Sequence, residues 1–283
     1  MCPDSILTLG DYSVNLYGLL IAIGILACFF VLFEYSKRAG IPNEYVDFAF
    51  YNGIASIVIG FIGAAFFDEL FDYIQAIKNG DPNPKFDLTN GGITAIGGLA
   101  TGAITFIIIC IIFRKKYPYA LTKLVAVAPM CMLVAHGFGR LGCLMAGCCH
   151  GEYLGQEYVF GGIKMRGELE GFPKWGYYVP TQLYEAIFLF LLFALLSLLL
   201  YKKNFKFALP VYLAGYGIWR FLIEFARADE RGALIGSLSP SQTLSLILIV
   251  LSVPAYFILK KFVTESKAYD AKKRAEASIP SEE

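Results

Sequence analysis

Long apolar runs alternate with short polar segments along most of the chain. Backbone amides find no water inside a bilayer of about 30 Å, so a run of about 20 apolar residues forms a spanning helix. Seven runs approach this length: Val14 to Phe33, Val46 to Phe67, Gly91 to Phe113, Leu121 to Gly137, Thr181 to Tyr201, Phe207 to Ile223 and Ser241 to Leu259. The pattern predicts an all-α polytopic membrane protein with about seven transmembrane helices.

The composition agrees with a chain that lies in a lipid bilayer. Hydrophobic residues make up 57% of the chain and charged residues only 17%, so the sequence is far more apolar than a soluble globular average. No basic stripe interleaved with aromatic residues indicates a nucleic-acid partner. The residues before Val14 lack the positive region and cleavage site of a signal peptide, so the first run is expected to be a permanent span.

Lys and Arg follow every second run and so predict how the chain is oriented. Short segments rich in these residues stay in the cytoplasm. They follow the first, third, fifth and seventh runs, at positions 37–38, 114–116, 202–206 and 260–261. The N-terminus is therefore expected outside and the C-terminus inside. We expect a membrane-embedded domain over residues 1–263, with an external head segment at 138–180 and a disordered cytoplasmic tail at 264–283.

Ionisable residues inside a membrane span are costly and usually face a cavity or a partner. Tyr216, Arg220, Glu224 and Arg227 are spaced four, four and three residues apart in the sixth run, which places them on one helical face. This spacing predicts a polar functional stripe. The alternative is a structural ion pair between Arg220 and Glu224, with Arg227 reaching to the outer interface.

Polar or small residues also stand near the predicted ends of three other helices. Thr181 and Gln182 can bond the free amides at the start of the fifth helix, and Glu185 lies one turn further and could partner an arginine. Glycines of the third run, such as Gly97 and Gly98, permit close helix packing or let backbone approach a ligand. Tyr17, near the outer end of the first helix, is ordinary for an interface.

The stretch GRLGCLMAGCCHG at residues 139–151 allows three interpretations. Its cysteines and His150 could bind zinc, although the spacing is irregular and adjacent cysteines would ligate one ion only with strain. Cys143 and Cys148 could form a disulfide or redox pair. We favour the third interpretation, in which Arg140 binds an anionic lipid headgroup and glycines such as Gly139 let backbone amides approach it. Arg140, Arg220 and Arg227 would lie at the outer face with too few acidic residues to neutralise them, and a lipid phosphate would supply the missing negative charge. We therefore assign no metal ligands.

Five motifs in a fixed order carry a resemblance to a known family. They are NLYGLL, GGITAIGGL, HGFGRLG, VPTQLYE and YGIWRFLIEFAR, and they extend from Tyr17 towards the last helix. The chain resembles the bacterial prolipoprotein diacylglyceryl transferases. The resemblance implies a multi-pass protein of the bacterial cytoplasmic membrane that moves a diacylglyceryl group from phosphatidylglycerol to the lipobox cysteine of a preprolipoprotein. Glycerol phosphate is released, and no cofactor is required.

The resemblance also implies roles for the matched residues. The implied catalytic residues are Arg140 at the phosphate, Arg220 as a second cation, and Glu224, which positions Arg220. We also include His136 among the catalytic residues, because it lies four residues before Arg140 on the same helical face. The implied substrate-binding residues are Tyr17, Tyr216, Gln182, Glu185, Arg227, Gly97, Gly98 and Gly139. A histidine or a buried glutamate could accept the thiol proton, and the sequence leaves the general base open.

Several positions depart from the family signature. Cys143, Ala146 and Cys148 stand where the family usually carries asparagine, asparagine and glutamate, and Ile96 and Val179 stand where histidine is common. A site built on amide hydrogen bonds would have to be rebuilt to bind the same groups. Two alternatives therefore stay open: a related transferase with a different acceptor, and a non-enzymatic membrane sensor of thiols or metal.

Overall fold

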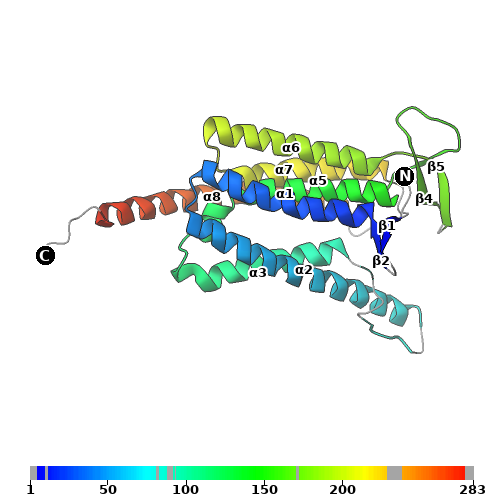
Figure 1. The fold of residues 1–283 in the computed structure, drawn as a ribbon, viewed down its shortest axis with the longest axis horizontal. Helices are drawn as coiled ribbons and strands as arrows, with labels where there is room; N and C mark the ends of the chain where they lie inside the picture. Colours follow the sequence, from blue (N-terminus) through cyan, green and yellow to red (C-terminus); the bar gives the residue numbers. More distant parts are fainter. Residues whose placement is uncertain are drawn as a thin grey trace. The chain divides into compact units, whose positions relative to one another are not determined.

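The structure is a computed structural model that describes residues 5–9, 12–80, 83–87, 92, 94–169, 172–227 and 238–277. The chain divides into two compact units (Figure 1). Unit 1 comprises Met1–Gly40 and Val125–Glu283, and unit 2 comprises Ile41–Leu124. Each unit has its own helical packing and is described separately.

Unit 1 is a bundle of long helices with short strands at one end. Figure 1 shows α1, α5, α6 and α7 running alongside one another, and α7 also packs on α8. The elements are β1 (Ser5–Leu9), β2 (Tyr12–Asn15), α1 (Leu16–Ala39), α5 (Ala128–Ala146), β3 (Tyr153–Gly155), β4 (Ile163–Leu169), β5 (Phe172–Tyr178), α6 (Thr181–Lys203), α7 (Ala208–Ile223), η2 (Glu224–Ala226) and α8 (Pro240–Ala277).

Unit 2 is built on the close packing of two helices. Its elements are α2 (Asn43–Lys78), α3 (Ala95–Ile112), η1 (Phe113–Lys115) and α4 (Ala120–Leu124). A Cβ added at Gly98 would lie 3.0 Å from the Cβ of Ala64, and one added at Gly102 would lie 3.1 Å from the carbonyl oxygen of Ser56. Glycines therefore let α3 approach α2, which confirms the packing interpretation of the third run. Gly91, at the start of that run, lies outside the described residues.

The expected number of spans differs slightly from the structure. Six helices in the described part of the chain are long and apolar enough to cross a membrane: α1, α2, α3 with η1, α5, α6 and α8. The sixth expected span is α7, which has 16 residues. The chain is a polytopic, mostly helical protein, as expected, and six rather than seven helices meet the length requirement by themselves.

The fourth expected span lies further along the chain than the apolar run indicated. The run breaks between α4 and α5, where Pro129 suits the first turn of a new helix, and α5 then continues to Ala146. Leu144 is buried in the last turn of α5, and Gly147 ends the helix with a positive φ of 73°. Arg140 and Cys143 are therefore helical, and the non-helical head begins near residue 147 instead of 138.

Small antiparallel sheets complete unit 1 and were not expected from the sequence. Strands β3, β5 and β4 lie in that order in one sheet, and β1 pairs with β2 before α1 begins. Met165 and Tyr178 are fully buried against Leu144, so the three-stranded sheet is anchored on the end of α5. This contact places the segment between α5 and α6 next to the polar residues of both helices.

The C-terminal segment is helical where we expected disorder. Helix α8 continues without interruption to Ala277, and Lys272 lies 3.9 Å from Glu276 as an i,i+4 ion pair. Alanine, lysine and glutamate are strong helix formers, and they extend the helix beyond its apolar part. The expected tail is thus wrong for residues 264–277, while residues 278–283 lie outside the described part. A single membrane domain over residues 1–263 stays a prediction.

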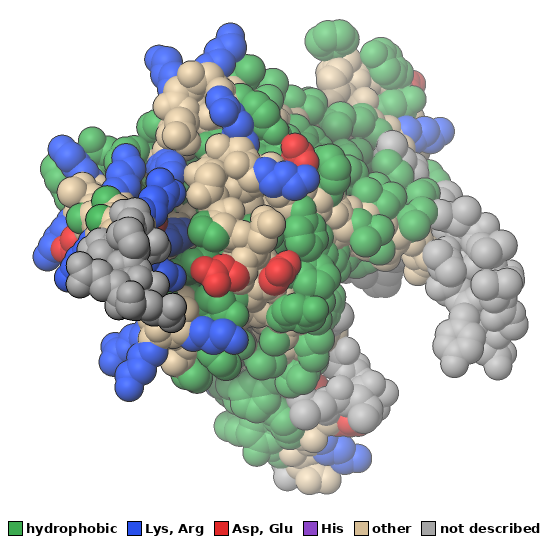
Figure 2. Space-filling view, turned by 60° about the vertical axis from the view of Figure 1, so that its left-hand side comes forward, with side chains coloured by type: hydrophobic (Ala, Val, Ile, Leu, Met, Phe, Trp, Pro, Cys, Tyr) green, Lys and Arg blue, Asp and Glu red, His purple; other side chains and the backbone are tan. Residues whose placement is uncertain are grey.

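The basic ends of α1 and α6 meet at one end of unit 1. Arg38 donates to the carbonyl of Tyr201, and Lys206 Nζ donates to the carbonyl of Ala39 at 3.1 Å. Figure 2 shows Lys and Arg side chains gathered on the face turned towards the viewer, beside hydrophobic side chains. This placement agrees with the expectation that the segments after the first and fifth spans share a side. The orientation of the termini in a membrane stays a prediction.

Candidate functional site

Glu185 joins three helices of unit 1 through one buried carboxylate. It lies on α6 with its side chain 1% exposed, and its Oε2 is 3.0 Å from Nε of Arg140 on α5. The hydroxyl of Tyr216 on α7 donates to Oε1 at 3.1 Å, and Nε2 of His136 lies 3.7 Å from the same oxygen. A buried carboxylate needs such partners because it has lost its hydration. We call these four residues the Glu185 cluster.

The helical course of α5 arranges this cluster. His136 and Arg140 are one turn apart on α5, and the His136 ring meets the Tyr216 ring edge-on at a centroid distance of 5.3 Å. Because Gly139 is helical, its amide belongs to α5, so the expected approach of glycine amides to a headgroup is wrong. A Cβ added at Gly139 would meet nothing within 4 Å among the described residues. The space next to Gly139 is therefore open.

A second ionic group lies between α7 and the start of α8. Arg220 Nη2 is 2.8 Å from Glu224 Oε2 and donates to Ser241 Oγ at 2.9 Å. Ser239 Oγ donates to Glu224 Oε1 at 2.7 Å. The ion pair between Arg220 and Glu224 that the sequence allowed is confirmed. Nη1 of Arg220 is buried with no hydrogen-bond partner in the described part of the chain, and such a donor favours an acceptor from a ligand.

Arg227 does not lie on the helical face that its spacing predicted. Helix α7 ends at Ile223, residues Glu224–Ala226 form a 3₁₀ turn, and Arg227 is extended and pairs with Gly151 in a β-bridge. The prediction of one continuous stripe is therefore wrong for Arg227. Arg140 and Arg220 each have a glutamate partner, so the three arginines bring less uncompensated positive charge than we expected.

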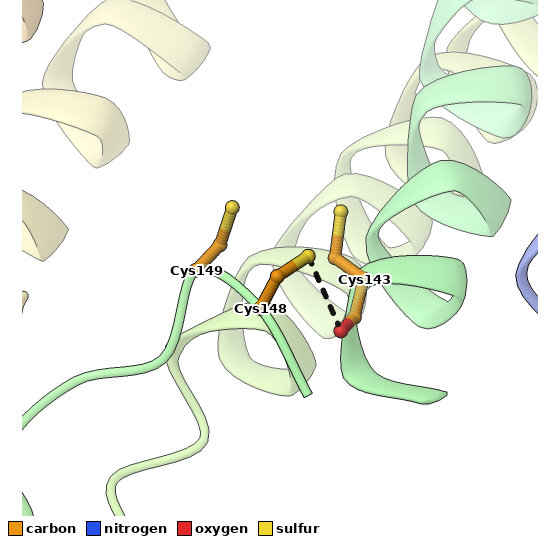
Figure 3. Close-up of side chains that lie close together, drawn as sticks. All are labelled: Cys143, Cys148 and Cys149. Carbon is orange, nitrogen blue, oxygen red and sulfur yellow. Dashed lines mark hydrogen bonds between the residues drawn. The ribbon is translucent and has the colours of Figure 1, made fainter. Parts of the chain in front are cut away.

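Three cysteines converge where α5 ends, as Figure 3 shows. The sulfur atoms of Cys143, Cys148 and Cys149 all lie within 4.8 Å of one another, and we call these residues the cysteine cluster. The amide of Cys148 donates to the carbonyl of Cys143, and that of Gly147 to the carbonyl of Leu144. This is the Schellman pattern, in which the residues of the longer bond also bring their side chains together.

The cysteine cluster contains one acidic thiol. Hydrogen bonds with Cys143 and Cys148, and then with Arg227, lower the pKa of the Cys149 thiol well below its usual range. Hydrogen bonds with Cys143 and Cys149, together with burial, raise the pKa of the Cys148 thiol. Proximity to an arginine is a known way to stabilise a thiolate. Cys149 is thus the member of the cluster that carries negative charge first.

The first turn of α6 holds the segment that carries these cysteines. Thr181 Oγ1 donates to the carbonyl of Cys149 at 2.8 Å, and Gln182 Nε2 donates to the carbonyl of Cys148. Both side chains are buried, and neither makes the expected cap of its own helix. Sequence reasoning placed them correctly at a helix start but missed that they bind the neighbouring turn.

The remaining expected residues are divided between the two units. Tyr17 on α1 is 43% exposed, and its ring would contact a Cβ at Gly142, so it lies against the same helix as Arg140. Gly97 and Gly98 belong to unit 2, where they lie on α3 against Phe67 and Ala64 of α2. Nδ1 of His150 lies 2.9 Å from the carbonyl oxygen of Gly151, and the imidazole stays outside the cysteine cluster.

Comparison with known proteins identifies the family. The sequence model of the family described as prolipoprotein diacylglyceryl transferase matches residues 4–258. The chain belongs to this family. The resemblance that rested on five motifs is thereby confirmed over nearly the whole chain, and the protein is a member of a transferase family of polytopic membrane proteins.

Individual relatives of this diacylglyceryl transferase family member align over most of their length. A protein of Clostridium tetani is 32% identical over 242 residues, which cover 84% of this chain and 90% of the relative. One of Lactobacillus delbrueckii subsp. bulgaricus is 33% identical over 271 residues, 93% of this chain and 92% of the relative. One of Staphylococcus aureus is 30% identical over 257 residues. All three are named phosphatidylglycerol–prolipoprotein diacylglyceryl transferase.

Two residues that contact the ionic group of this diacylglyceryl transferase family member were not predicted from the sequence. Ser239 and Ser241 bind Glu224 and Arg220, although they were not among the expected site residues. The only signal was their position at the start of α8, where serine usually caps a helix. Their contacts depend on how α7 packs against α8, which no local pattern reveals.

Proposed function

We propose that the protein transfers a diacylglyceryl group from phosphatidylglycerol to the lipobox cysteine thiol of a prolipoprotein and releases glycerol phosphate. Membership of the family and the names of the relatives support this activity. The observation that carries it in this chain is the ion pair of Arg140 with the buried Glu185, in which Nε lies 3.0 Å from Oε2. An arginine positioned in this way can direct its two Nη groups at a phosphodiester.

The chemistry needs a cation at the group that leaves. The acceptor sulfur attacks a glycerol carbon, the carbon–oxygen bond to phosphate breaks, and the phosphate gains negative charge. Arg140 neutralises this charge, and the buried Nη1 of Arg220 offers a second donor. Tyr216 donates a hydrogen bond to the Glu185 carboxylate, and His136 lies 3.7 Å from the same oxygen.

The location of the protein follows from the same reasoning. Six apolar helices support a multi-pass membrane protein, and we propose that it lies in the cytoplasmic membrane of a bacterium. The Glu185 cluster and the non-helical head would then face the outer side, where prolipoproteins arrive. The basic ends of α1 and α6 would face the cytoplasm, in accordance with the bias of positive charge towards that side.

A transfer assay with purified protein tests the proposal. Phosphatidylglycerol with a labelled glycerol backbone and a lipobox peptide are incubated with wild type, Arg140→Lys and Arg114→Ala. The lysine variant keeps the positive charge but loses the two Nη donors of the guanidinium. We expect its rate of diacylglyceryl transfer to fall by about 100-fold or more. Arg114 is an exposed arginine of η1, so its variant is a matched control and keeps the wild-type rate.

The products decide between the open alternatives. Label on the peptide cysteine, together with free glycerol phosphate, supports the proposed transfer. Release of glycerol phosphate without labelled peptide would indicate a different acceptor, which the changes at Cys143, Ala146 and Cys148 allow. If neither product forms, or if Arg140→Lys is as active as wild type, the proposed function is overturned.

A further inference from the structure

The cysteine cluster is not explained by the proposed phosphate chemistry. Three thiols lie close together where α5 ends, and all three are free rather than joined in disulfides. Packing alone would bring Cys143 and Cys148 together at the helix end, but it gives no reason for Cys149 to turn towards them. The sulfur of Cys149 lies within 4.8 Å of both other sulfurs.

The backbone of Cys149 is left-handed, and its sulfur lies close to that of the adjacent Cys148. Cys149 has a positive φ of 61°, and Gly147 before it has a φ of 73°. A left-handed residue reverses the chain direction, so consecutive side chains no longer point to opposite sides. Adjacent Cys148 and Cys149 were expected to ligate one ion only with strain, and in the structure their sulfurs lie within 4.8 Å of each other. Non-glycine residues adopt this conformation only where their surroundings hold it, and such positions cluster at functional sites.

The sulfur separations suit a soft divalent ion. Zinc binds thiolates at about 2.3 Å, so two sulfurs of a tetrahedral site lie about 3.8 Å apart. Sulfurs that already lie within 4.8 Å of one another need to move by only about 1 Å to reach this spacing. Three protein ligands and an open fourth position are the arrangement of catalytic zinc sites. Cys148 is exposed, so the fourth position is reachable from outside the bundle.

Neighbouring residues form an outer shell around the three sulfurs. The carbonyls of Cys148 and Cys149 are fixed by Gln182 and Thr181, so the segment is held from α6. Arg227 interacts with the sulfur of Cys149. Three thiolates and one Zn²⁺ carry a net charge of −1, which the arginine balances. Outer-shell groups of this kind orient ligands and tune a metal site.

We propose that Cys143, Cys148 and Cys149 bind a Zn²⁺ ion whose fourth position takes the thiol of the acceptor. This inference rests on the proposed function, because it assigns the metal to the acceptor half of that reaction. Cys143 lies three residues after Arg140 on α5, hence about one helical turn away on the same face. The activated sulfur would therefore be next to the arginine that holds the phosphate.

The metal solves the problem of deprotonating a thiol near neutral pH. A free thiol with a pKa near 8.5 is mostly protonated, whereas a thiol bound to zinc is deprotonated outright. The acceptor thiol binds zinc and releases its proton to water at the membrane surface. Its sulfur then forms a bond to the glycerol carbon, the carbon–oxygen bond breaks, and the electron pair leaves with the phosphate oxygen. The thioether product is a weaker ligand and dissociates from the metal.

Cobalt(II) is the probe for the metal site, because thiolate-to-cobalt charge transfer is visible in absorption spectra. Full-length protein in detergent is reduced, stripped with a chelator and titrated with Co²⁺ and then with Zn²⁺. We expect about one Co²⁺ per chain, displaced by zinc. Cys148→Ser and a triple serine variant of the cysteine cluster should lose the band. Cys28→Ala removes a cysteine outside the cluster and should keep it.

The outer shell and the acceptor are tested with the same spectrum. Arg227→Gln should lower the affinity for Co²⁺ by about 10- to 100-fold without abolishing the band. A lipobox peptide should increase the charge-transfer intensity as a fourth thiolate binds, and the same peptide with serine in place of cysteine should not. Peptide transfer should fall in chelated protein and return with added zinc.

The outcomes separate this inference from the proposed function. If wild type and the triple serine variant bind Co²⁺ equally, or neither binds, the metal site is overturned. If transfer is equally fast in chelated protein while Arg140→Lys stays inactive, the transferase stands and the zinc role is overturned. If Co²⁺ and the cysteine peptide bind but no lipid is transferred, the proposed function fails and the thiol-binding metal site stands.

Discussion

Glu185→Gln is the substitution that tests most directly how the site is built. Glutamine has nearly the same shape and keeps an oxygen that can accept the hydrogen bond of Tyr216. It removes the negative charge that lies 3.0 Å from Nε of Arg140. The variant therefore isolates the charge of Glu185 from its volume and from its bond to α7.

The expected effect follows from the burial of the pair. The Glu185 side chain is 1% exposed and that of Arg140 is 17% exposed, so the arginine would keep its charge with little solvent to stabilise it. Breaking a buried pair by removing one partner costs about 3–5 kcal/mol, and the partial exposure of Arg140 places this site at about 3 kcal/mol. A loss of this size lowers the melting temperature by about 5–10 °C.

The assay combines thermal unfolding in detergent with the transfer rate. If the misplaced guanidinium no longer meets the phosphate, the same 3 kcal/mol corresponds to a rate about 100-fold lower. Glu34→Gln is the control, because Glu34 pairs with Lys37 at 3.3 Å on the exposed surface of α1. Such exposed pairs contribute little, so this variant should melt and react like wild type.

A double variant separates uncompensated charge from lost contacts. Arg140→Gln combined with Glu185→Gln removes both charges, so its melting temperature should recover most of the loss while its activity stays low. Wild-type stability and activity in Glu185→Gln alone would refute the reasoning, because the carboxylate would then neither stabilise Arg140 nor position it. A double variant less stable than either single variant would show that packing, not charge, dominates.

Three further substitutions test the packing and the thiols. Gly98→Val should overpack α2 against α3 at a cost of about 1–3 kcal/mol and lower the melting temperature, whereas Gly18→Val, which meets nothing within 4 Å in the described structure, should not. Gly147→Ala strains a left-handed residue and places a Cβ against the carbonyl of a neighbouring strand, so the cysteine cluster should lose its Co²⁺ affinity. In chelated protein, Cys149 should react with iodoacetamide well below pH 8.5, because its lowered pKa keeps thiolate present as the pH falls. Arg227→Gln should raise the pH at which half of Cys149 is labelled. Mass spectrometry of the labelled peptide measures this midpoint.

Each of these expectations has a contrary result. Equal melting temperatures for Gly98→Val and Gly18→Val would show that the helices of unit 2 can move apart at no cost. Full Co²⁺ affinity in Gly147→Ala would show that the turn does not assemble the cysteine cluster. A Cys149 midpoint at or above pH 8.5 would show that its neighbours do not stabilise the thiolate.

The sequence by itself determined the class of the protein and most of its helices. Apolar runs of bilayer length can satisfy their backbone only as helices, so the expected runs appear as helices in the structure. The spacing of Arg220 and Glu224 likewise allowed the ion pair that the structure contains, because an i,i+4 contact is local in the sequence. Local geometry is sufficient for both conclusions.

Tertiary structure decided which polar residues meet. The contacts of Glu185 with Arg140 and Tyr216 join three helices, and the bonds from Thr181 to the carbonyl of Cys149 cross between separate elements. The sequence suggested an arginine partner for Glu185 but not which one. Such pairs depend on how helices pack, and the spacing along one helix carries no information about the face of another.

Backbone conformation decided the cysteine cluster. From the sequence, Cys148 and Cys149 were neighbours that would ligate one ion only with strain, and Cys143 stood in the expected external head segment. The structure extends α5 to Ala146 and turns the chain back through two left-handed residues, so three sulfurs meet. A positive φ at a cysteine has no signature in composition or periodicity. Side chains of α6 donate hydrogen bonds to the carbonyls of Cys148 and Cys149, and only the packed structure reveals these contacts.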